Sequence, residues 1–174
     1  MKGQSHQGFT LIELLIVVAV LGIIASIAIP GMLRARRAGA EASAIGSMRV
    51  IFSAQSAFAQ SCGGTFYAPT LDELGKSPVP GSPSFISPDL GFAPVVVKSR
   101  YSITLGGAAV PTAPATCTGL GAGQAAAGFQ ATATSIDGGW RHFAVNTSGT
   151  VWQDANPFVG VPEYGVPGSG TPVQ

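Results

Sequence analysis

The chain has 174 residues, a formal net charge of +1 and only 10% charged residues, together with 24 Gly and 13 Pro. This length accommodates one membrane segment and one modest domain. The small, balanced charge excludes the electrostatic footprint that nucleic-acid binding requires, so we predict no nucleic-acid partner.

A hydrophobic stretch, Phe9 to Leu33, begins close to the N-terminus and contains one ionisable side chain, Glu13. Roughly 20 such residues are enough for a helix to cross a bilayer core, and a lone apolar segment can lie in lipid only as a helix. Gly22, Pro30 and Gly31 weaken a helix, so we predict a bend near Pro30.

Glu13 is the unusual residue of this stretch. A carboxylate inside the hydrocarbon is costly, which makes it a functional-site hypothesis with a partner to be named. The alternative interpretation is an acid near the membrane surface whose side chain reaches water. The spacing alone leaves both interpretations open.

The motif around Glu13 reads Gly8-Phe9-Thr10-Leu11-Ile12-Glu13-Leu14, after a polar leader of residues 1–8 and before an apolar run that contains Pro30. It resembles the class III signal of type IV prepilins and type II secretion pseudopilins. The resemblance implies that a prepilin peptidase cleaves between Gly8 and Phe9 and methylates the new amine of Phe9. It also implies that Glu13 pairs with the Phe9 amine of a neighbouring subunit.

The same resemblance implies partners and a location. Copies of the chain would form a helical filament with the help of an inner-membrane assembly platform. Before assembly, the chain would be a single-pass protein of the inner membrane, in contact with lipid and with its C-terminal domain outside. Afterwards it would belong to a cell-surface or periplasm-spanning filament.

Two features of the segment favour other interpretations. An ordinary secretory signal would have Lys2 as its charged region and Ser26-Ile27-Ala28 as its cleavage site, although Glu13 and the long apolar run count against it. The cluster Arg34, Arg36 and Arg37 mildly favours a cytoplasmic C-terminal domain, whereas the resemblance places that domain outside.

The helical pattern continues beyond Pro30, and we predict one helix from Thr10 to about Ser61 that ends at Cys62-Gly63-Gly64. Its second half is amphipathic and should pack on a sheet. We predict the following packing stripe, with Met48, Ile51, Gln55 and Phe58 beside it: Ala38, Ala42, Ile45, Arg49, Phe52 and Ala59.

Cys62 and Cys117 are the two cysteines of the chain. In an exported domain they would form a disulfide closing a loop of about 55 residues, whereas in the cytoplasm they would be two buried thiols. No further Cys or His lies at ligand spacing, so we predict no zinc site.

The C-terminal part predicts a small antiparallel sheet. Strand patterns lie in Val95 to Leu105, in Gly128 to Ile136 and in the two arms of Trp140 to Asp154 around a turn at Asn146, which gives about four strands. Residues 65–94 should be a covering loop with one possible short helix at residues 70–75. Residues 106–127 should be a loop, and the tail 155–174 should be irregular. The predicted fold class is α+β, a long N-terminal helix packed on an antiparallel sheet, which is also the architecture that the resemblance implies.

Four segments follow: a leader 1–8, a transmembrane or filament-core half-helix 9–33, an amphipathic half-helix 34–62 and a sheet domain 63–174. One departure from many pilins is the absence of a C-terminal disulfide loop, since Cys62 lies at the end of the helix.

No catalytic constellation, cofactor motif or metal-ligand pattern stands out, so we predict a protein that is not an enzyme and has no small-molecule substrate. A cation site at Asp137, Asp154 and Glu163 is an open alternative. Asn146 begins a glycosylation sequon, but its role in the hairpin turn also explains this residue. The predicted function is a structural subunit of a type IV pilus or pilus-like filament. The alternatives are a type II secretion pseudopilin and, from another class, a secreted monomeric binding module.

Overall fold

A long helix, α1, spans Leu11–Ser61 in the computed structural model, which describes residues 8–138 and 140–173. Pro30 lies inside this helix without interrupting it, and the bend expected there stays a prediction. The chain divides into two compact units, Met1–Gly39 and Ala40–Gln174. We call the second unit the head, and it contains the last turns of α1.

Glycine ends α1 where the sequence predicts. The N–H groups of Cys62 and Gly63 both donate to the carbonyl of Phe58, and Gly64 takes a left-handed φ of 57°. A side chain at Gly63 would clash with the carbonyl oxygen of Phe66, which lies 2.1 Å from the position of its Cβ. The helix therefore stops here because only glycine allows the chain to turn back so closely.

The segment after α1 covers one side of the core and contains two single-turn helices, α2 (Leu71–Leu74) and α3 (Pro88–Gly91). The buried amide of Gln55 holds the start of this segment. Its Nε2 donates to the carbonyl of Ala68 over 2.7 Å, and its Oε1 accepts from the N–H of the same residue over 2.9 Å. Both polar ends of a fully buried side chain are thus satisfied.

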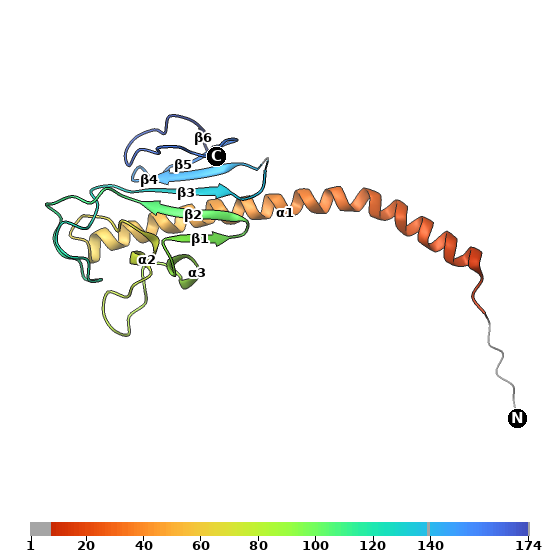
Figure 1. Cartoon of the computed structure of the whole chain (residues 1–174), viewed down its shortest axis with the longest axis horizontal. Coiled ribbons are helices and arrows are strands. Elements are labelled where there is room, and N and C mark those ends of the chain that lie inside the picture. The colour runs from red at the N-terminus through yellow and green to blue at the C-terminus, as the bar shows by residue number, and fades with distance from the viewer. Residues whose placement is uncertain (1–7, 139, 174) are drawn as a thin grey trace, which may run out of the picture. The chain divides into compact units, whose positions relative to one another are not determined.

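The sheet has six antiparallel strands in chain order rather than about four (Figure 1). The strands are β1 (Val95–Lys98), β2 (Tyr101–Gly106), β3 (Gln130–Ser135), β4 (His142–Asn146), β5 (Val151–Asp154) and β6 (Thr171–Pro172).

Two of the six strands were not predicted from the sequence, for different reasons. The predicted strand from Val95 to Leu105 is a hairpin, because Ser99 and Arg100 take φ values of 49° and 67° and reverse the chain. Positive φ at both central positions is typical of tight hairpin turns, which usually contain Gly or Asn. The last strand, β6, lies in the tail that was predicted to be irregular and pairs with β5.

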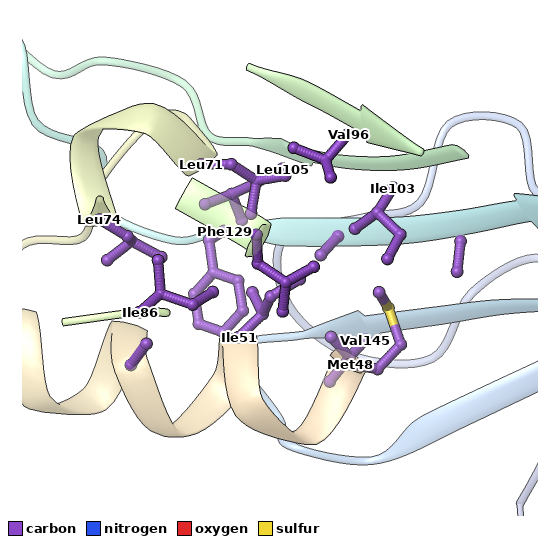
Figure 2. Close-up of a cluster of buried hydrophobic side chains, with 14 of the residues drawn as sticks. Met48, Ile51, Leu71, Leu74, Ile86, Val96, Ile103, Leu105, Phe129 and Val145 are labelled. Atoms are coloured by element: carbon purple, nitrogen blue, oxygen red, sulfur yellow. The ribbon is translucent and has the colours of Figure 1, made fainter. Parts of the chain in front are cut away.

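The hydrophobic core lies between the head part of α1 and the sheet. Figure 2 shows Met48 and Ile51 of α1 beside sheet residues such as Val145. The predicted packing stripe was right only at its end: Ala59 is buried, whereas Ala42 and Arg49 are exposed and Ile45 and Phe52 are only partly buried. The buried face includes the four residues that were predicted beside the stripe. Its members are Glu41, Ala44, Ser47, Met48, Ile51, Ala54, Gln55, Phe58 and Ala59.

The tail after β5 is held to the sheet by Asn146, whose side chain is fully buried. Its Nδ2 donates to the carbonyls of Pro162 and Gly165 over 2.9 and 2.8 Å, and its Oδ1 accepts from Ser148. Every polar group of the Asn146 amide is thus engaged. The turn role therefore accounts for this residue, and its amide nitrogen is inaccessible to a glycan in the folded head.

Candidate assembly site

The N-terminal half of α1, Leu11–Gly39, is the segment from which a site can be built. It is long and apolar enough to cross a membrane, and none of its most hydrophobic part is buried by the chain itself. Leu11 and Ile27 are 81% and 76% exposed. Because burying a Leu or Ile side chain contributes about 1.5–3 kcal/mol, the row of exposed apolar side chains needs lipid or protein around it.

The predicted cleavage point lies just before this helix. Gly8 and Phe9 are exposed and adopt no regular secondary structure. A Cβ added to Gly8 would meet no atom of this chain within 4 Å, so nothing in the described fold requires glycine there. The leader itself, residues 1–7, lies outside the described residues.

Thr10 and Glu13 together begin the helix. Thr10 stands at the N-cap position, and its Oγ1 accepts a hydrogen bond of 3.3 Å from the backbone N–H of Glu13, three residues on. This is one half of a capping box, in which the Glu side chain is placed to return toward the N-cap. The Thr-x-x-Glu pattern was visible in the sequence, and its capping role was missed.

Capping places the Glu13 carboxylate in the first turn of α1, on a helix whose first backbone N–H groups favour negative charge. The Phe9 amine that cleavage would create lies one residue before the cap. Glu13 and the new N-terminus would therefore lie about one helical turn apart, near the same end of α1. A small axial offset between parallel copies would bring the carboxylate of one copy beside the amine of the next.

Glycines of the exposed half have no role in packing within the chain. A Cβ at Gly22, Gly31 or Gly39 would meet no atom within 4 Å. Small residues on an apolar helix allow other helices to approach closely. Ser26 is the polar residue among them, and its hydroxyl donates to the Ile23 carbonyl over 2.7 Å, so it adds no unpaired group.

The predicted cysteine pair is bonded in the structure. Cys62, just after α1, and Cys117, in the loop between β2 and β3, form a disulfide with their Cα atoms 5.1 Å apart. The bond ties the loop of residues 107–127 to the end of the helix.

The remaining candidates from the sequence do not form a second site. Among residues 8–138 and 140–173, no group of three or more His, Cys, Asp or Glu could hold a metal ion, and Asp137 is engaged by Arg100. The Nδ1 atom of His142 accepts the N–H of Ser135 over 3.1 Å, and burial lowers the pKa of this histidine while Asp154 opposes the shift. His142 is thus a neutral structural acceptor.

Comparison with known proteins agrees with this geometry. Residues 3–29 match the family model described as the prokaryotic N-terminal methylation motif. The chain is 35% identical over 77 residues to the type IV major pilin protein PilA of Myxococcus xanthus (strain DK1622). The chain is type IV pilin-like. The similarity to that protein covers 44% of this pilin-like chain and about a third, 34%, of the relative, and no solved structure matches.

Proposed function

We propose that this chain is a structural subunit of a type IV pilus or pilus-like filament, assembled through α1 after cleavage between Gly8 and Phe9 and methylation of Phe9. The observation that carries the proposal is the fully exposed apolar half of α1. A water-soluble monomer would leave its row of Leu, Ile and Val side chains in solvent, at a cost on the order of tens of kcal/mol.

The proposed assembly step rests on two opposite charges near the N-terminal end of α1. Inside a bundle of apolar helices, the Glu13 carboxylate and the methylated ammonium of Phe9 are each costly alone and attract each other strongly in low dielectric. Methylation keeps the positive charge of the amine. The Phe9 ammonium of one copy would therefore pair with the Glu13 carboxylate of its neighbour. This pairing selects one axial register between copies.

Membrane topology and partners belong to the same proposal. Before assembly, the exposed half of α1 would lie in the inner membrane with the head outside, where a disulfide such as Cys62–Cys117 persists. The prepilin peptidase and an inner-membrane assembly platform would then act on it. These partners are inferred from the N-terminal motif and from the similarity to PilA.

A secretion pseudopilin remains the second candidate, because it would use the same signal and the same helix. The two differ in the product: short periplasmic pseudopili in one case and long surface fibres in the other. A module released after Ala28 is disfavoured, because Glu13 lies inside the apolar run and the run is long for an ordinary secretory signal.

The test uses Glu13→Ala, with Glu13→Gln as the matched variant that keeps the shape of the side chain. We expect both variants to be cleaved and inserted, and filament yield to fall about tenfold or more, because a buried ammonium is left without its partner. Normal filament yield from either variant would contradict the pairing.

A second pair of variants tests the processing step. Gly8→Val should block cleavage, and Gly8→Ala should reduce it less, while the head keeps its melting temperature, since a Cβ at Gly8 touches nothing in the described chain. Unaltered cleavage of Gly8→Val would remove the peptidase from the account.

A further inference from the structure

Charged side chains of the head are largely paired inside the head. Lys98 binds Asp89 and Lys76 binds Glu73, each over 2.5 Å. Two further ion pairs join Arg100 to Asp137 and Arg141 to Glu41. The Nε of Arg141, the residue before β4, donates to the buried Glu41 of α1 over 2.9 Å.

Two sets of charged side chains, one cationic and one anionic, lie outside these ion pairs. Arg34, Arg36 and Arg49, all exposed on α1, have no carboxylate within ion-pair distance among the described residues. Arg37 is not in this set, because it already has an interaction partner. Apart from Glu13, the acids without a cation among the described residues are Asp72, Asp154 and Glu163, all partly buried on the head.

The two sets occupy different elements. The three arginines lie on the helix, whereas Asp72 lies on α2, Asp154 on β5 and Glu163 in the tail. Once the leader and Lys2 are removed, the Glu13 and Phe9 charges are assigned to each other by the proposed function. The remaining unpaired side-chain charges of the described residues are then three cations on one element and three anions elsewhere.

Asp72 supplies an independent observation. Its Oδ1 is buried and has no hydrogen-bond partner, which is uncommon for a carboxylate oxygen. Asp154 accepts the N–H of Asn156, and Glu163 accepts the N–H of Ala108, so each of those carboxylates is at least partly satisfied. Asp72 is therefore the least satisfied of the three carboxylates within the chain.

Arg49 supplies the matching observation on the helix. It borders a groove of about 320 Å³ whose other walls are small or apolar: Val50, Ser53, Ala54, Ala57 and Phe85. A cation at the rim of an apolar groove favours an occupant that brings an acid and apolar surface together. The head of a second copy offers both.

We propose that Arg34, Arg36 and Arg49 of one copy bind the unpaired carboxylates Asp72, Asp154 and Glu163 of neighbouring copies, and that this charge match positions the heads in the filament. The inference rests on the proposed function, since it needs copies to assemble. The apolar half of α1 supplies non-directional attraction, whereas charge pairs select register and reject misplaced neighbours.

The test is a charge-swap matrix in the full-length chain, with filament yield as the readout. Each arginine is changed to Glu and each unpaired acid to Lys, singly and in the nine double combinations. We expect single reversals such as Arg49→Glu and Asp72→Lys to lower yield about tenfold, because like charges then face each other across the interface. At least one double variant should restore yield to within about twofold of the wild type.

Lys98→Glu is the matched control. It reverses a partly exposed cation that already pairs with Asp89 inside the head, so filament yield should change little. Head melting is measured for all variants, so that unfolding is separated from loss of contact between copies.

Two results would overturn the proposal. One is normal filament yield from all three arginine reversals. The other is a loss of membrane-bound chain in the arginine variants that no acid-to-Lys change restores, which would assign the arginines to anionic lipid headgroups. Failure of the proposed function gives a different result, because the wild-type chain itself would then form no filament.

Discussion

The two halves of α1 have the same secondary structure and different surroundings. In the N-terminal half, Leu11–Gly39, apolar side chains point outward on every side and none of the most hydrophobic part is covered. In the head half, apolar residues repeat every three or four positions, and Met48, Ile51 and Phe58 are completely buried against the sheet and its covering segment.

This difference separates folding from assembly. The head half has found its partners within the chain, so its residues determine the stability of the head. The N-terminal half has none there, so its residues should determine the attachment to membrane and to other copies. Substitutions in the two halves should therefore affect different measurements, even though they lie on one helix.

The largest effect on folding is expected from Phe58→Ala. Its ring is fully buried and contacts Phe85 edge to face, with centroids 5.3 Å apart, so truncation should cost about 3–5 kcal/mol of the unfolding free energy of the head. The matched variant is Ile24→Ala, which removes a side chain that is 59% exposed and should leave head unfolding unchanged. Both are measured by denaturant unfolding of the detergent-solubilised chain. Equal losses from the two variants would refute the division.

The next effect is expected at the end of the head half. Replacing both Cys62 and Cys117 by Ser should cost about 2–4 kcal/mol, because the unfolded chain regains the freedom of the loop that the bond closes. Thermal melting of the variant, compared with the wild type before and after reduction, measures it. A wild type that melts at the same temperature in both redox states would show that the bond contributes nothing.

The smallest effect concerns pH and His142. Because burial lowers its pKa from the ordinary value of 6.5, the folded head binds fewer protons than the unfolded chain in this range. The head should therefore have its full stability above about pH 6.5 and lose part of it as the pH falls toward 5. His142→Gln keeps an acceptor for Ser135 without a titrating group, so its unfolding free energy should change less between these values.

The carboxylates titrate in a lower pH range and therefore do not interfere with this test. The Lys98, Arg100 and backbone contacts lower the pKa values of Asp89, Asp137 and Asp154 below the ordinary 3.8. Their stabilisation is complete above about pH 4 and is lost only below it. A variant whose slope between pH 6.5 and 5 matched that of the wild type would remove His142 as the cause.

Local signals in the sequence predicted the elements that depend on them. The apolar run, the two glycines after Cys62 and the strand alternation gave the length of α1, its end and most of the sheet. The N-terminal motif gave the family resemblance. The helix cap at Thr10 also depends on a local signal, the Thr-x-x-Glu pattern, and could have been predicted from the sequence.

Features that depend on distant contacts were beyond the sequence. Two neighbouring stripes of α1 are both apolar enough to pack, and only the sheet selects the one through Met48 rather than the one through Arg49. The hairpin at Ser99 and Arg100 lacks the usual turn residues, and β6 exists because β5 offers it a free edge. The ion pair of Glu41 with Arg141 joins residues 100 positions apart.

The most direct test of the central claim is the intact mass and N-terminal residue of the chain recovered from assembled material. The claim is that the exposed half of α1 is retained and buried between copies. We expect a chain that begins with N-methylated Phe9 and still contains Leu11 to Leu33. A chain that begins at Ile29 would contradict this claim, and an uncut chain that still begins at Met1 would contradict the cleavage before Phe9.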